Sequence, residues 1–290
     1  MARIDALVGR GFSLSFELWP PRTETAAARL AAALEGLAVL QPTFASITYG
    51  AAGSTRARTH ELVLDLQRSG RLVPMAHLTC AAHTRAELAA ALGTYAAAGV
   101  ENVLALRGDP PLDATGTLAE GELAHAVELV ELAKETGDFC VAVAAHPEGH
   151  PDSPDLASDR RHLAAKLAVA DLAITQFFFE LGDYLGLVSE LSALGVDKPV
   201  LPGVMPITNV RTLSRMAELS GCAIPAHLAE QIAAAADRPD EVRKIGVEVA
   251  TELCGKLLGE GVPGLHFYTM NEAAATLEVC ANLGLPGTGR

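Results

Sequence analysis

Short apolar runs alternate along the chain with longer segments rich in Ala, Leu and Glu. The runs VLAL, VAVAA and AITQFFF are apolar at successive positions, which is typical of parallel strands covered on both faces. We predict eight strands from such runs and from the turn residues that bound them. They lie near Leu14–Leu18, Thr43–Tyr49, Leu72–Leu78, Glu101–Arg107, Phe139–Ala145, Leu172–Phe178, Lys198–Val204 and Gly264–Thr269.

The segments between these runs carry helix signals. Thr23 offers an N-cap to a segment that continues to Leu40. Thr84 and Glu87 have the spacing of a capping box, and Gly99 is the residue expected to end that helix. The first four predicted strands begin 29 residues apart, the length of one strand–helix unit. The pattern therefore predicts a repeated βα unit.

Eight strands that are each followed by a helix close naturally into a (β/α)8 TIM barrel, an α/β fold. We expect residues 1–290 to form one such barrel as a single domain. Roughly three helices lie between the seventh and eighth predicted strands, from Val210 to Leu258, and we interpret them as extra helices before the last strand. An open, doubly wound sheet is the alternative.

Composition narrows the class of protein. The 22 Lys and Arg residues against 35 Asp and Glu residues give a net charge of −13, and no basic run is present, so nucleic acid is not an expected partner. Nothing approaches an uncharged apolar run of about 20 residues, and Met1–Phe12 lacks the apolar core of a signal peptide. The five cysteines form no C-x-x-C pair, so we expect buried thiols. We expect a cytoplasmic protein with no membrane partner, and a homo-oligomer because symmetric assemblies are common.

Polar residues gather where the predicted strands end. Barrel enzymes place their working groups at the carboxyl ends of the strands, so these side chains should converge. They are Glu17, Thr48, Tyr49, His77, Thr79, Arg107–Asp109, His146–His150, Gln176, Thr269 and Asn271.

Two of these positions suggest chemistry by their neighbours. Glu17 lies in FELWPP, where aromatic and proline side chains leave a carboxylate poorly solvated, which raises its pKa and suits it to hold a proton. The alternative is a solvent-facing carboxylate or one paired with an arginine. Arg107-Gly108-Asp109 reads as a ligand loop in which Gly108 permits close backbone approach, and an internal ion pair is the alternative.

The histidines invite a metal-hydrolase hypothesis, which the spacing does not favour. His146 and His150 stand near Glu148, and His77 and His266 also lie near the ends of predicted strands. Pro147 and Gly149 exclude a helix that would aim both rings of the first pair one way, and H-E-x-x-H is absent. We therefore expect no metal. No G-x-G-x-x-G opens a helix after a predicted strand, and a G-x-S-x-G elbow is absent.

Eight strings, taken in order, resemble one family. They are SFELWPPRT, SITYGAAGSTRARTH, HLTC, LALRGDPP, HPEGHPD, AITQFFFE, LPGVMPIT and GVPGLHFYTMN. Together they resemble methylenetetrahydrofolate reductase of the bacterial type, which has the catalytic domain alone. The resemblance implies FAD at the carboxyl end of the barrel, reduced by NAD(P)H, which then leaves. It implies that 5,10-methylenetetrahydrofolate next binds in the same place and is reduced to 5-methyltetrahydrofolate, a methyl source for methionine synthesis.

The resemblance also implies roles for the residues at the strand ends. Glu17 would protonate N10 of the folate and open the five-membered ring to a 5-iminium cation. Asp109 would lie by the flavin and pterin and stabilise that cation, and Gln176 would hydrogen-bond pterin or nicotinamide. The residues expected to contact FAD are Thr48, His77, Arg107, Gly108, Asp109, His146, His150, Asp159, His162 and Lys166.

Some positions depart from the family pattern. His146 stands where the family commonly has a tyrosine over the flavin, Val210 where an aromatic stacks on the substrate, and Glu272 where an arginine meets the glutamate tail. A Tyr-Ala pair is not recognisable between Leu112 and Gly121. Two alternatives therefore stay open. One is a flavin-independent or deazaflavin-dependent methylene-tetrahydropterin reductase on the same barrel, and the other is a non-catalytic folate- or flavin-binding protein.

Overall fold

The computed structural model describes residues 2–50, 56–108 and 121–285, and within them eight parallel strands form a closed barrel in chain order. The barrel closes where β8 pairs with β1, with Glu17 beside Tyr268. This confirms the predicted TIM barrel and contradicts the open sheet. The strands are β1 Ser13–Leu18, β2 Phe44–Ile47, β3 Pro74–Thr79, β4 Asn102–Leu106, β5 Cys140–Ala145, β6 Leu172–Phe177, β7 Val200–Val204 and β8 Gly264–Tyr268.

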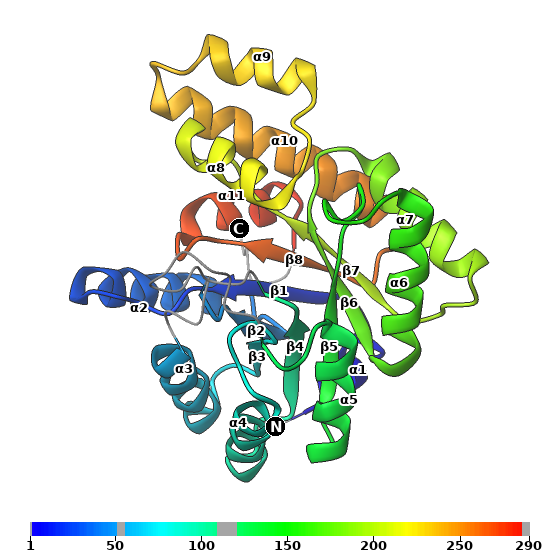
Figure 1. Ribbon diagram of the computed structural model, residues 1–290. Coiled ribbons are helices and arrows are strands. Elements are labelled where there is room, and N and C mark those ends of the chain that lie inside the picture. Colours follow the sequence, from blue (N-terminus) through cyan, green and yellow to red (C-terminus); the bar gives the residue numbers. More distant parts are fainter. Residues whose placement is uncertain (1, 51–55, 109–120, 286–290) are drawn as a thin grey trace, which may run out of the picture.

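Helices surround the barrel, and the group between β7 and β8 extends away from it at the top of Figure 1. This group is α8, α9 and α10, which confirms the extra helices expected before the last strand. The helices are α1 Ile4–Val8, α2 Glu24–Ala38, α3 Arg56–Ser69, α4 Arg85–Ala97, α5 Ala126–Thr136, α6 Leu156–Val169, α7 Leu181–Ala193, α8 Val210–Ser220, α9 Ala226–Ala234, α10 Pro239–Gly259 and α11 Ala273–Asn282.

Local signals set the ends of several helices as expected. The Thr23 side chain accepts a hydrogen bond from the backbone of Ala26 at the start of α2. Thr84 and Glu87 form a reciprocal capping box at the start of α4. Gly99 follows α4 with a φ of 76°, a left-handed conformation that glycine adopts without a steric penalty.

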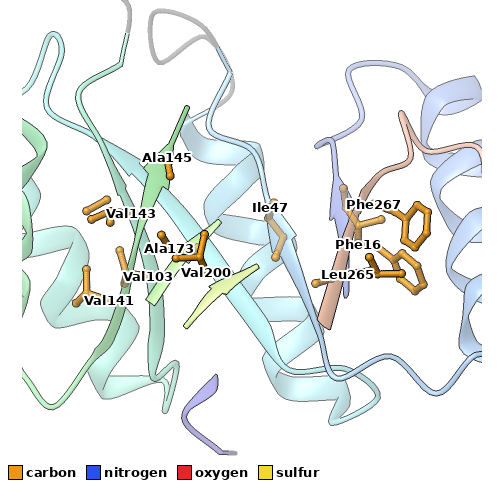
Figure 2. Close-up of a cluster of buried hydrophobic side chains, with 14 of the residues drawn as sticks. Phe16, Ile47, Val103, Val141, Val143, Ala145, Ala173, Val200, Leu265 and Phe267 are labelled. Atoms are coloured by element: carbon orange, nitrogen blue, oxygen red, sulfur yellow. The ribbon is translucent and has the colours of Figure 1, made fainter. Parts of the chain in front are cut away.

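Strand side chains alternate between two cores. One set faces the helices, and Figure 2 shows Phe16, Leu265 and Phe267 of this set together beside β1 and β8. The other set fills the barrel and includes Phe44, Met75 and Leu104. Because successive residues of a strand point to opposite faces, Glu17 follows helix-facing Phe16 and points into the barrel.

The short helix α1 was not predicted from the sequence. Its Ile4 is fully buried in the core inside the barrel, and the Ile4 N–H donates to Asn102 Oδ1 at 2.8 Å. Five residues are too few for a periodic apolar pattern, so a tertiary contact with β4 stabilises this helix rather than its own sequence.

The state of the cysteines and the character of the helices follow from the described residues. Each of the five cysteines is buried as a free thiol, as expected. None of the helices in the described ranges has the length and apolar character needed to span a bilayer.

Candidate functional site

Glu17 is a buried carboxyl group at the carboxyl end of β1. Only 9% of the residue is exposed, and burial raises the pKa of this carboxyl to about 7. The Trp19 indole N–H donates to Glu17 Oε1 at 3.0 Å and opposes part of that rise in pKa. Glu17 therefore neither faces solvent nor pairs with an arginine of the described residues, and a pKa of about 7 leaves about half of these carboxyl groups protonated at neutral pH.

His77 lies beside this carboxyl group on β3. Its Nε2 is 4.0 Å from Glu17 Oε2, and burial lowers the pKa of His77 to about 3. The imidazole is therefore neutral at physiological pH and forms no ion pair with Glu17. Its Nε2 is buried and has no hydrogen-bond partner among the described residues, so it is available to a bound molecule.

Trp19 is fixed from the far end of the chain. The Trp19 N–H donates to Asn271 Oδ1 at 2.9 Å, and Asn271 Nδ2 donates to the Trp19 carbonyl at 2.8 Å. The Thr269 hydroxyl donates to the Glu17 carbonyl at 2.9 Å. Asn271 itself has a φ of 58°, a left-handed conformation that asparagine tolerates better than most residues. The loop after β8 thus holds the segment that carries the carboxyl group.

A cleft of about 620 Å³ opens above Glu17. Its floor is made by residues at the ends of β1, β3 and neighbouring strands, and one wall by α8. Gly108 lies in this floor with a φ of 76°, and a Cβ there would lie 2.7 Å from Thr79 Cβ, so only glycine fits. Among the expected site residues, those that line it are Glu17, Thr48, His77 and Gly108.

A second cavity of about 430 Å³ adjoins the first through the peptide that joins Arg107 to Gly108. Lys166 is half-buried in its wall, its Nζ donates to the Ala144 carbonyl at 3.0 Å, and desolvation lowers the pKa of the amine. The expected residues that line this cavity are Arg107, His146, His150, Asp159, His162 and Lys166. One lysine, one arginine and three imidazoles form a donor set that suits phosphate and hydroxyl groups.

Two expected cofactor residues in this cavity are engaged with protein groups. Arg107 donates to Asp152 at 2.6 Å. Asp159 Oδ1 accepts from the His150 N–H at 3.2 Å, and its Oδ2 accepts from Arg160 at 2.9 Å. Asp159 therefore shapes the loop after β5 with both of its carboxylate oxygens.

Arg160 is a site residue that the sequence reasoning missed. It is 3% exposed, and its guanidinium donates to the carbonyls of His146 at 2.9 Å and Pro147 at 2.6 Å. It also donates to Glu190 at 2.7 Å. The sequence offers little indication of this role for Arg160, because an arginine within a polar helix usually points to solvent.

The remaining expected residues are spread more widely. Gln176 lies in β6 where the register to β7 shifts, and its Oε1 accepts from the Phe177 N–H at 3.0 Å rather than lining the cleft. His266, one of the histidines behind the metal hypothesis, lies inside the barrel between Ser15 and Ser46. His77 and His146 line different cavities. Asp109 lies outside the described residues.

Comparison with known proteins places these features in context. A family model for methylenetetrahydrofolate reductase matches residues 3–284. The chain is similar to 5,10-methylenetetrahydrofolate reductase of Pectobacterium carotovorum subsp. carotovorum, with 34% identity over 280 residues that cover 96% of this chain and 92% of that protein. The Escherichia coli (strain K12) protein of the same name is 35% identical over 277 residues, covering 95% and 92%.

A plant relative and a solved structure extend the comparison. Methylenetetrahydrofolate reductase (NADH) 1 of Arabidopsis thaliana is 37% identical over 286 residues, which cover 94% of this chain and 48% of the plant protein. This chain therefore spans about half of that relative. A Clostridium thermocellum protein, whose structure is described as binding two copies of 5-methyl-5,6,7,8-tetrahydrofolic acid, matches with a TM-score of 0.67 and 13% identity over 96% of each chain. At that identity the likeness shows the fold alone.

Proposed function

The chain belongs to the methylenetetrahydrofolate reductase family, and on this basis we propose that it reduces 5,10-methylenetetrahydrofolate to 5-methyltetrahydrofolate through bound FAD, with NAD(P)H as the reductant. The single observation that carries this proposal is the buried Glu17 carboxyl, whose pKa is raised to about 7, in the floor of the cleft. The product would supply methyl groups for methionine synthesis.

Glu17 acts in this proposal as the general acid. A pKa near the working pH lets a carboxyl group hold a proton and still release it to a substrate nitrogen. Transfer of that proton to N10 weakens the bond from N10 to the methylene carbon, and the five-membered ring opens to a 5-iminium cation. Neutral His77 does not stabilise the Glu17 carboxylate by charge, so it does not oppose the rise in the Glu17 pKa that burial causes.

The described residues fit FAD. His77 Nε2 is a buried polar atom without a partner, and Gly108 leaves room that a side chain would fill. We assign Thr48, His77 and Gly108 to the flavin ring and its chain. FAD, when bound, would supply the hydride that it accepts from NAD(P)H.

The second cavity would hold the rest of the cofactor. Lys166 supplies positive charge to the diphosphate, and His150 and His162 supply ring nitrogens to the ribityl and adenosine parts. Arg107 and His146 line the same cavity. We propose that Asp109, outside the described residues, stabilises the cation formed on the folate and that Gln176 hydrogen-bonds the pterin.

The test separates the two half-reactions. The visible spectrum of the purified protein should show a flavin that NADH bleaches anaerobically and methylenetetrahydrofolate restores. Glu17→Gln should keep NAD(P)H oxidation by a quinone and lose folate reduction, because only the second step needs the proton. Equal loss of both half-reactions would contradict the role of Glu17.

The same experiment tests the two alternatives. A colourless protein that FAD does not activate, yet that reduces the folate with NAD(P)H or a deazaflavin, would replace the flavin proposal by the flavin-independent or deazaflavin-dependent one. Binding of folate or flavin without turnover under either condition would support the non-catalytic protein.

A further inference from the structure

Glu148 belongs to the HPEGH segment, and the proposed function gives it no role. It is exposed in the loop after β5, where both oxygens of its carboxylate accept from one backbone donor, the Ala223 N–H, at 3.1 Å and 3.2 Å. Ala223 follows α8 and lies 75 residues further along the chain. Since α8 forms one wall of the cleft above Glu17, a side chain of the loop after β5 holds the end of that wall.

The same carboxylate lies beside Cys222. This cysteine is 8% exposed and belongs to the apolar cluster that α8, α9 and α10 share. Burial raises the pKa of its thiol, and the neighbouring Glu148 carboxylate raises it further. Glu148 therefore contacts the point at which the end of α8 enters that cluster.

A packing contact joins the same two segments. Gly221 ends α8 in a left-handed conformation with a φ of 72°, and its N–H donates to the Ala217 carbonyl at 2.9 Å. A Cβ at Gly221 would lie 2.6 Å from Pro151 Cγ, so the proline ring packs against the backbone of this turn. Glu148 and Pro151 thus meet the end of α8 from one loop.

The loop after β5 is itself fixed to α6. Arg160 donates to the two backbone carbonyls just before Glu148, at 2.9 Å and 2.6 Å. Asp159 accepts from the His150 N–H, two residues after Glu148, at 3.2 Å. The Glu148 side chain therefore extends from a backbone that is held on both sides, which lets it fix another segment.

Resting on the proposed function, we propose that Glu148 is a positioning residue for the reduction: it holds the carboxyl-terminal end of α8, so that this wall of the cleft keeps its distance from Glu17. Asn209 fixes the other end of the helix, because its Oδ1 accepts from the Thr212 N–H at 2.8 Å. With both ends held, Met216 and the other cleft-lining residues of α8 keep their places. Without Glu148 the wall shifts and the cleft loses affinity for its substrates, whereas the reacting groups on the barrel strands stay where they are.

Hydrogen exchange tests the hold on α8 without turnover. In the FAD-loaded wild type the Ala223 amide should be protected, because the Glu148 carboxylate accepts from it. In Glu148→Ala this amide should exchange about fivefold faster, the scale of one hydrogen bond. Glu148→Gln keeps one acceptor oxygen and should restore most of the protection.

Steady-state kinetics separate substrate affinity from chemistry. Glu148→Ala should raise the KM of both NAD(P)H and methylenetetrahydrofolate about fivefold and change kcat less than about twofold, because the interaction acts on binding in the ground state and the transition state alike. Glu180→Gln is the control for charge. Like Glu148, Glu180 lies near enough to Asp183 to raise its pKa, but no hydrogen bond of the described residues joins it to the end of α8. This control should leave both KM values unchanged.

A pair of glycines tests the packing contact. The Cβ of Gly221→Ala would meet Pro151, whereas that of Gly195→Ala, after α7, has nothing within 4 Å. Gly195 has a φ of 80°, so both substitutions carry the same kind of backbone strain. Gly221→Ala should raise both KM values, and Gly195→Ala should raise neither.

Three outcomes would overturn the positioning role of Glu148. They are unchanged exchange at Ala223 in Glu148→Ala, a lower stability of this variant with unchanged KM values, and equal changes in Glu148→Ala and Glu180→Gln. A wild type that catalyses neither half-reaction would contradict the proposed function instead. Exchange at Ala223 would then decide alone whether Glu148 holds α8.

Discussion

At the scale of single residues, the position and pKa of Glu17 depend on Trp19. The indole N–H donates to Oε1, and Oε2 lies on the side of His77, 4.0 Å from its Nε2. The contact with the indole lowers the Glu17 pKa against the larger effect of burial. The hydrogen bond from Trp19 therefore adjusts the Glu17 pKa, which burial raises.

Trp19→Phe keeps an aromatic wall and removes the N–H. The Glu17 pKa should rise by about one unit, the scale of one hydrogen bond to a carboxylate. The folate half-reaction needs protonated Glu17, so its rate falls as pH rises through this pKa, and the variant should move that fall to higher pH. Stopped-flow rates across pH measure it, with flavin reduction in the same variant as reference. A lower rate at every pH with an unmoved midpoint would mean that Trp19 only supports the structure.

At the scale of elements, α6 holds the loop after β5 through one side chain. Arg160 binds the carbonyls of His146 and Pro147 and a carboxylate oxygen of Asp159. These groups border the second cavity, so the helix and the proposed diphosphate site are mechanically joined.

Arg160→Met should destabilise the protein by about 3 kcal/mol, because it leaves a buried carboxylate and two carbonyls without their partner. FAD affinity should fall as well, since the loop loses its anchor. Urea denaturation and FAD titration measure the two effects. The neighbouring exposed Arg161→Met is the control and should change neither. Equal effects of both variants would refute the anchoring role.

A glycine in α10 supports the cleft wall from behind. A Cβ at Gly246 would lie 1.9 Å from the Ile207 carbonyl oxygen, in the segment that leads into α8. Gly246→Ala must therefore push this backbone and should cost about 1–3 kcal/mol. Gly259, at the end of the same helix, has nothing within 4 Å of such a Cβ, so Gly259→Ala should be neutral or slightly stabilising. Thermal unfolding of the pair measures the contrast, and matched melting temperatures would show that α10 yields without strain.

Much of this architecture could be predicted from the sequence because it depends on short-range patterns. Apolar runs identified all eight strands, and the length between β7 and β8 identified the extra helices. Helix α1 was missed because its stability comes from Asn102, nearly a hundred residues away. The resemblance to the family is confirmed by the match over residues 3–284.

The features of the site also fall into those that the sequence predicted and those that it did not. The surroundings of Glu17 in the sequence predicted a raised pKa, and the structure attributes the rise to burial, whereas the hydrogen bond from Trp19 opposes part of it. The partners of Trp19 and Asp159 were not predictable, because Asn271 and Arg160 act through side-chain geometry that no spacing encodes. Asp159 lines the second cavity, and its carboxylate oxygens also bind protein groups of the loop after β5.

At the scale of the whole molecule, Glu17 reduces the stability of the fold. The unfolded carboxyl releases its proton near the model value of 4.5, and the folded one near 7. The folded state binds this proton more tightly, so the free energy of unfolding falls as pH rises between these values and then levels off. The full effect is at most about 3 kcal/mol.

Glu17→Gln should therefore make the protein more stable above pH 7 and leave its stability little changed below pH 4.5. Urea denaturation of both proteins at several pH values measures the difference. Glu35→Gln, an exposed site on α2, is the control for the loss of a negative charge. A difference between Glu17→Gln and the wild type that did not grow with pH would contradict the raised pKa.

The two hydrogen bonds between Trp19 and the Asn271 side chain have a consequence for the synthesis of the chain. These residues are 252 positions apart. A ribosome adding 5–20 residues per second needs roughly 13–50 s to reach Asn271 after Trp19. Throughout that interval β1 lacks its β8 neighbour, and its acid has no fixed position. The proton donor therefore gains its fixed position only after β8 has been synthesised and has paired with β1.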